Sequence, residues 1–148
     1  MKKIVSFLFL LVLSISLVAC SYTGRNAQVV RTQWDENTKD GNYYIIGSVE
    51  ELTNYITEEN ENRLSQYIDG YAESFFEEKS LVLVLISESS GSVSHKLKDI
   101  KFNGDVVDIT IKRNVPEIGT CDMAETTIMF EVSKEEANTI KDVNLIQK

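Results

Sequence analysis

Apolar and polar positions follow three different patterns along the chain. An uncharged apolar run occupies residues 4–19, and the residues that follow it are polar without a sustained period. From about residue 42, apolar side chains recur at helical or strand spacing. We therefore predict a leader, a flexible tether over 20–41 and one folded domain over 42–148. Within the tether, a short first strand around Val29 is the alternative.

The first part of the domain predicts one strand followed by helices. Residues 43–46 form a compact aromatic and β-branched run between two glycines, which is typical of a strand. Ser48 and Glu51 match a capping box, and the apolar residues after them have helical spacing. A second helical pattern covers 64–71, and a short turn at 75–76 is expected to pack on the sheet.

From residue 80 the apolar period changes to two, which predicts strands. Residues 81–86 are apolar at every position, as in a central strand that is covered on both faces. The next segment, over 92–102, switches parity near Lys98, which indicates a β-bulge. Asn103-Gly104 then predicts a hairpin, because glycine and asparagine tolerate the positive φ angles of tight turns.

Two more alternating segments, a late helix and a last strand complete the pattern. The alternation covers 107–111 and 126–132, Ser133 and Glu136 form a second capping box, and 143–146 is the last apolar segment. The predicted fold class is α+β, with N-terminal helices packed on a mostly antiparallel β-sheet and one short late helix.

The leader has the organisation of a bacterial lipoprotein signal peptide. Two lysines precede the apolar run, which would span roughly 24 Å as a helix and so falls short of a ~30 Å hydrocarbon core. Leu17-Val18-Ala19-Cys20 matches a lipobox, in which the cysteine is acylated and becomes the mature N-terminus. We therefore predict a signal peptide over 1–19 and a lipid on Cys20 that anchors the protein to the extracytoplasmic face of the cell membrane. An ordinary signal peptide, with Cys20 there by chance, is the alternative.

The charge of the chain excludes one class of partner. The 148 residues carry a formal net charge of −8, and the leader holds two lysines and no acidic residue, so the remaining 129 residues carry −10. Such a chain lacks the basic surface that nucleic acid requires. Anionic headgroups would repel the surface as a whole, so we expect the acyl chains to hold the domain at the membrane. A flexible tether of about 20 residues would place the domain roughly 25 Å from the bilayer.

No pattern for catalysis or metal binding stands out in the sequence. One histidine and two cysteines cannot form an ordinary zinc site, and hydrolase, phosphate-loop and EF-hand motifs are absent. Cys121 with His95 as its base is the candidate for thiol chemistry, whereas a small buried cysteine and a strand-face histidine are the favoured interpretation. We therefore expect no enzyme activity, cofactor or metal. An exported thiol-dependent enzyme and a small-ligand-binding lipoprotein remain the alternatives.

The most informative connection lies between the strands that flank residues 112–124. It contains the chain's one proline, Pro116, and a glycine, Gly119, which fix and bend the backbone. Connections of this length inside compact domains are usually functional or disordered. Arg113, Asp122 and Met123 are candidates for a recognition surface, and an internal Arg113–Asp122 ion pair is the alternative.

Residues from about 75 to 132 resemble the C-terminal domain of the PrcB-like family, small bacterial lipoproteins named for a protease-complex subunit. The matching residues outside the strands are Phe75, Phe76, Ser90, Gly91, Ser92, Arg113, Pro116, Gly119, Thr120, Asp122, Met123 and Ala124. The resemblance implies a non-catalytic, membrane-anchored module that binds or stabilises an extracytoplasmic protease. We therefore predict that the 89–92 turn and the 113–124 loop form the contact surface for a protein partner.

Overall fold

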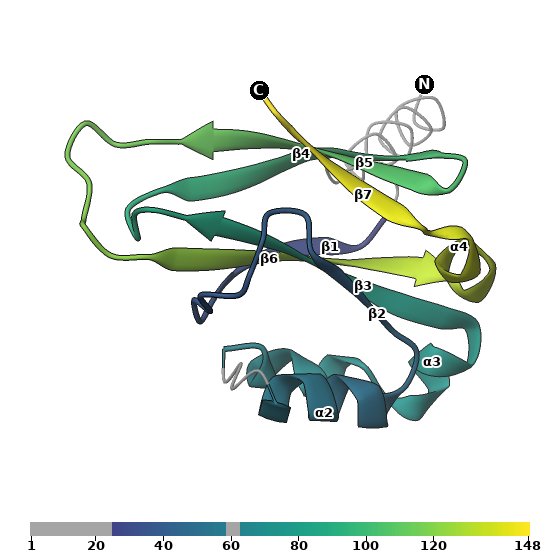
Figure 1. Cartoon of the computed structure of the whole chain (residues 1–148). Coiled ribbons are helices and arrows are strands. Elements are labelled where there is room, and N and C mark those ends of the chain that lie inside the picture. The colour runs from purple at the N-terminus through teal and green to yellow at the C-terminus, as the bar shows by residue number, and fades with distance from the viewer. Residues whose placement is uncertain (1–24, 59–62) are drawn as a thin grey trace, which may run out of the picture.

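The chain folds into two β-sheets with a layer of helices on one side (Figure 1). The computed structural model describes residues 25–58 and 63–148, so the predicted signal peptide and the lipid site at Cys20 lie outside the described residues. Within the described part, no helix is long and apolar enough to cross a membrane. The fold class is α+β with mostly antiparallel strands, as the sequence predicts, but the strands form two sheets where one was predicted.

The first sheet contains four antiparallel strands in the order β1-β6-β3-β2. Its two central strands, β3 and β6, are buried at almost every position, which confirms the prediction of a doubly covered strand over 81–86. The strands are β1 (Ala27–Thr32), β2 (Tyr43–Ile46), β3 (Lys79–Glu88) and β6 (Ala124–Ser133).

The second sheet has the order β4-β5-β7 and contains the predicted bulge and hairpin. Its strands are β4 (Ser94–Asn103), β5 (Val106–Asn114) and β7 (Asp142–Gln147), and β7 runs parallel to β5. The register of β4 against β5 shifts between Leu97 and Asp99, where the parity switch indicated a bulge. Because Asn103 already pairs with Val106, the hairpin turn consists of Gly104, with φ of 69°, and Asp105, one position later than predicted.

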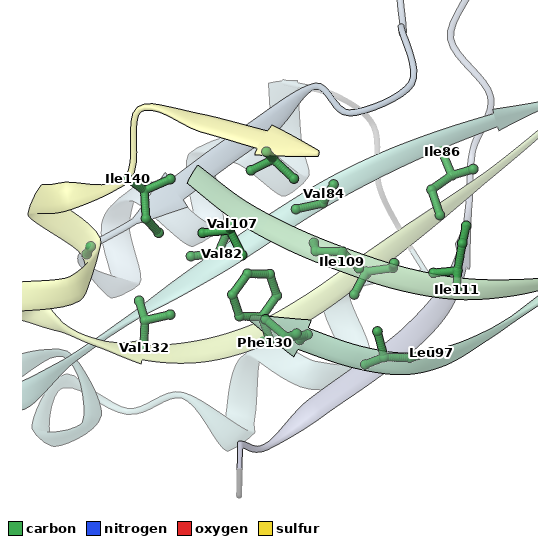
Figure 2. Close-up of a cluster of buried hydrophobic side chains, with 14 residues drawn as sticks. Val82, Val84, Ile86, Leu97, Val107, Ile109, Ile111, Phe130, Val132 and Ile140 are labelled. Carbon is green, nitrogen blue, oxygen red and sulfur yellow. The ribbon is translucent and has the colours of Figure 1, made fainter. Parts of the chain in front are cut away.

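The two sheets face each other across the larger hydrophobic cluster (Figure 2). Alternate residues of β3 point into it, because successive side chains of a strand face opposite ways. Phe130 of β6 and Ile109 of β5 are fully buried between the sheets. Members of the cluster on β3, β5 and β6 are Val82, Val84, Ile86, Val107, Ile109, Ile111, Ile128, Phe130 and Val132.

Helical segments cover the other face of the four-stranded sheet. They are α2 (Val49–Glu58), the 3-10 helix η1 (Ser65–Gly70) and α3 (Glu73–Glu78). Leu52 of α2 and Phe76 of α3 belong to the same buried cluster as Leu81 and Leu83 of β3. The helix predicted over 64–71 is instead the short η1, whose flanking backbone bonds, such as Tyr67 N–H to Leu64 O at 2.9 Å, span three residues.

Serine residues begin two of the helices, as predicted. At α4 (Lys134–Thr139), Ser133 and Glu136 form both bonds of a capping box. At α2, the Glu51 backbone N–H donates to Ser48 Oγ at 3.1 Å, while the Glu51 carboxylate accepts from the Gly47 N–H at 2.6 Å. In a standard capping box the carboxylate would accept from the N–H of Ser48 itself, so at α2 this bond goes to the preceding residue instead.

Strand β1 corrects the predicted tether. Residues 27–32 pair with β6 from Ala27 opposite Phe130 to Thr32 opposite Glu125, so the alternative of a first strand around Val29 is confirmed. The folded domain thus begins well before residue 42. Backbone hydrogen bonds to the edge of β6 hold this strand in place, and Val30 is its buried apolar side chain. The strand was therefore hard to predict from an apolar pattern.

Replacing Val30 tests whether β1 belongs to the folded domain. Val30→Ala removes two methyl groups from the helix-side cluster and should lower the free energy of unfolding by about 2 kcal/mol. Gln28→Ala, on the same strand but half-exposed, should change it by less than about 0.5 kcal/mol. Urea unfolding measures the free energy for both variants. If neither substitution changes it, residues 27–32 belong to a flexible tether and not to the folded domain.

Candidate functional site

The two segments predicted as a contact surface leave the sheets at the same end of the molecule (Figure 1). Strand β3 ends at Glu88, opposite Ala124, where β6 begins. In the second sheet, Ser94 at the start of β4 lies opposite Asn114 at the end of β5. This register brings the β3–β4 turn and the β5–β6 loop together.

Hydrogen bonds join the turn and the loop, which we call the paired loops (residues 89–93 and 115–123). The Gly91 N–H donates to Asp122 Oδ1 at 3.0 Å, and the Thr120 N–H donates to Ser92 Oγ at 3.0 Å. The hydroxyls of Ser92 and Thr120 also lie 3.0 Å apart. The hydrogen bond from Thr120 and the Gly91 N–H lower the pKa of Asp122. The carboxylate of Asp122 is therefore a fixed acceptor between the two segments.

Glycine at residue 91 permits the close approach of the Asp122 side chain. A Cβ atom at this position would overlap the Asp122 carboxylate. At Gly119, a Cβ would lie 3.1 Å from Ser90 Oγ. The small residues of the predicted surface thus permit the contact between its two halves.

The paired loops expose apolar side chains above this polar frame. Ile118 is 89% exposed, and Val115 and Met123 are also exposed. The predicted contact residues that lie in the paired loops are Ser90, Gly91, Ser92, Pro116, Gly119, Thr120, Asp122 and Met123. The structure brings these residues together at one end of the sheets.

Arg113 does not pair with Asp122, so the internal ion pair considered from the sequence is wrong. Arg113 lies in β5, and its Nε and Nη2 donate to Glu88 Oε1 and Oε2, each at 2.7 Å. The Glu88 side chain is only 6% exposed, and the Arg113 hydrogen bonds hold the pKa of Glu88 below its ordinary value. Arg113 therefore stabilises the strands at the base of the paired loops, through Glu88.

Glu88 also contacts the chain's one histidine. His95 Nε2 lies 2.8 Å from Glu88 Oε1, and His95 Nδ1 lies 3.4 Å from Thr126 Oγ1. We call Glu88, His95, Arg113 and Thr126 the Glu88 cluster. Its members come from β3, β4, β5 and β6, so it fastens the two sheets together at the base of the paired loops.

Arg31 of β1 adds a further tie to the turn. Its Nη2 donates to the carbonyl oxygens of Gly91 and Val93, at 2.6 and 2.7 Å. Neither Arg31 nor Glu88 was predicted from the sequence as part of the site. Glu88 could have been found from its parity, because it follows Val84 and Ile86 on the inward face of β3. Arg31 lay in the segment assigned to the tether.

The arrangement does not place His95 as a base for Cys121. The Cys121 side chain is exposed, so the expectation of a small buried cysteine is wrong. The His95 side chain is fully buried, and Glu88 and Thr126 occupy its two ring nitrogens. Among the described residues, no cluster of three or more His, Cys, Asp or Glu side chains is placed to hold a metal ion.

A second acidic residue is buried on the opposite face of the same sheet. Glu125 is 2% exposed, and its Oε1 accepts from Thr32 Oγ1 at 3.0 Å. Its other oxygen, Oε2, has no hydrogen-bond partner among the residues that the structure describes. Burial raises the pKa of Glu125, in contrast to Glu88.

Comparison with known proteins finds no family model, no curated protein and no solved structure that matches the chain.

Replacing Glu88 tests the buried ion pair. Glu88→Gln should lower the free energy of unfolding by about 2 kcal/mol at pH 7, less than for a fully buried pair because the Arg113 side chain is 33% exposed to water. The pKa of Glu88 is lowered by folding, so its stabilisation is complete above the ordinary carboxyl pKa near 4.5 and is lost as the pH falls through the folded value. Urea unfolding from pH 7 to pH 3 should therefore show a shrinking difference between the two proteins.

The control for this variant is Asp99→Asn, which breaks the exposed Lys101–Asp99 pair and should change stability by less than about 1 kcal/mol. A Glu88→Gln protein as stable as the Asp99→Asn protein would contradict the role given to the Glu88 cluster.

Replacing Glu125 should have the opposite effect. Glu125→Gln keeps an oxygen acceptor for Thr32 and removes a buried charge, so it should stabilise the fold at pH 7 by about 1 kcal/mol. Because folding raises the pKa of Glu125, the gain should be absent at pH 3 and should grow as the pH rises through the raised value. Thermal unfolding across this pH range measures it, and a destabilised variant at pH 7 would contradict this account of Glu125.

Proposed function

We propose that this protein is a membrane-anchored bacterial lipoprotein whose α+β domain is a non-catalytic module that binds or stabilises another protein. The observation that carries the proposal is the surface of the paired loops. Exposed Val115, Ile118 and Met123 stand on a frame of hydrogen bonds between Ser92, Thr120 and neighbouring residues. Apolar side chains that a rigid scaffold presents within a polar rim are typical of protein-binding surfaces.

An extracytoplasmic protease is the proposed class of partner. The support is the resemblance of residues 75–132 to the PrcB-like family. Several residues that carry this resemblance, including Ser92, Thr120 and Asp122, are those that join the paired loops. In this proposal the residues that resemble the family keep the shape of the surface, while Ile118 and Met123 contact the partner.

The lipobox at residues 17–20 supports the anchor. In this proposal the lipid on Cys20 holds the domain at the extracytoplasmic face of the cell membrane, and the paired loops recruit the partner there. The thiol-dependent enzyme is disfavoured because Glu88 and Thr126 engage both nitrogens of His95.

Site-specific photo-crosslinking in intact cells tests the proposed surface. A photoreactive amino acid in place of Ile118 should give one discrete adduct with another protein. The same residue in place of Trp34, an exposed apolar side chain in the β1–β2 connection, is the control and should not give that adduct. Mass spectrometry of the adduct should identify a protease. A different class of protein would remove the protease from the proposal, and identical adducts from both positions would contradict the surface.

A further inference from the structure

The charged residues are divided between the two outer layers of the molecule. The segments α2, η1 and α3 together contain seven acidic residues and no basic residue. The β4–β5 hairpin, over 94–114, contains five basic and three acidic residues in a chain whose net charge is −8. The helical layer and the three-stranded sheet lie on opposite sides of the four-stranded sheet (Figure 1).

Three lysines on the outer side of the three-stranded sheet form what we call the lysine face (Lys96, Lys98 and Lys112). All three are exposed, and the neighbouring Leu97 and Ile111 point into the core. No described helix covers this side of the sheet (Figure 1). None of the three lysines forms an ion pair within the described ranges.

Two of these lysines repel each other. Lys96 of β4 and Lys112 of β5 occupy directly opposite positions in the register. Like charges at such positions destabilise a sheet. Asp99 and Asp108 share this side of the sheet but lie toward the hairpin turn, where Asp99 pairs with Lys101, so the unpaired lysines are concentrated at the end beside the paired loops. An anionic surface at that end would relieve the repulsion between Lys96 and Lys112.

The start of the described chain lies beside the same sheet. The Arg25 guanidinium is 4.4 Å from the centre of the Phe102 ring, in β4, and its Nη1 donates to Glu136 at 2.9 Å. Cys20 precedes Arg25 by five residues, which span at most about 18 Å even when fully extended. Phe102 packs against the cluster between the sheets, so the start of the described chain lies at the β4 edge of the three-stranded sheet. Because β1 takes up residues 27–32 of the predicted tether, a lipid on Cys20 keeps this edge of the domain close to the bilayer.

We propose that the lysine face lies against the anionic headgroups of the membrane that holds the lipid. This inference rests on the proposed lipoprotein function and adds an orientation to it. An anionic surface attracts the lysines and repels the acidic helical layer, so both effects turn the domain the same way. The strands then run along the bilayer, and the paired loops at their ends lie beside the headgroups, where a membrane-associated partner is within reach.

Lysine acetylation of the full-length, lipidated protein tests this orientation. The protein is reconstituted in vesicles of phosphatidylcholine, with or without 30% phosphatidylglycerol, and mass spectrometry follows the labelling of each lysine. Lys96, Lys98 and Lys112 should react at least threefold more slowly on the anionic vesicles. Lys39, in the β1–β2 connection, should react equally on both. About 0.5 M NaCl should abolish the protection because it screens surface charge.

A matched pair of variants controls for the fold. Lys96→Gln with Lys112→Gln should reduce the protection of Lys98, whereas Lys39→Gln with Lys79→Gln should leave it unchanged. All four side chains are exposed, so both variants should fold.

The outcomes separate this inference from the proposed function. Equal labelling on both kinds of vesicle, with Cys20 acylated by mass, overturns the orientation and leaves the anchored module standing. An unacylated Cys20 overturns both. Protection that persists in high salt overturns the electrostatic contact. Protection in intact cells but not on anionic vesicles would mean that a protein covers the lysine face, which also overturns the inference.

Discussion

Strands β3 and β6 bury side chains on both of their faces, and most of the architecture follows from covering them. A lone sheet would leave one face in water, so the chain places the β4-β5-β7 sheet on one side and helical segments on the other. Neither layer can be removed without exposing a hydrophobic cluster. The central pair also aligns the strand ends, and this alignment brings the paired loops to one end of the molecule.

The same end of the four-stranded sheet holds two buried carboxylates that folding affects in opposite ways. Glu88, between the sheets, receives two hydrogen bonds from Arg113 and keeps its charge. Glu125, on the helix side, has one unpartnered oxygen, and burial favours its neutral form. Glu88 thus joins the two sheets at the base of the paired loops through Arg113 and His95, whereas Glu125 has a hydroxyl partner in Thr32 and no cationic partner. The contrast follows from the ion-pair partners of Glu88 and from the deeper burial of Glu125.

The sequence predicted those elements that depend on residues close to one another in the chain. Alternation located the strands, a parity switch located the bulge, and Ser133 with Glu136 located the start of α4. Strand β1 was predicted only as an alternative, because pairing with β6 rather than its own hydrophobicity holds it. The turn and the loop that were predicted as one contact surface are joined by hydrogen bonds, and their role in binding a partner stays a prediction. The partner of Arg113 was missed, because Glu88 lies 25 residues away in sequence and the contact depends on how the sheets stack.

The β3–β4 turn and the β5–β6 loop form one surface whose shape is fixed by hydrogen bonds between them. Amide hydrogen exchange at Gly91 and Thr120 tests it most directly, since each N–H donates to a side chain of the other segment. We predict that both amides exchange more slowly than in an unstructured peptide, and that Asp122→Ala speeds the exchange at Gly91 more than at Thr120. Exchange of both amides at the rates of an unstructured chain would contradict the claim.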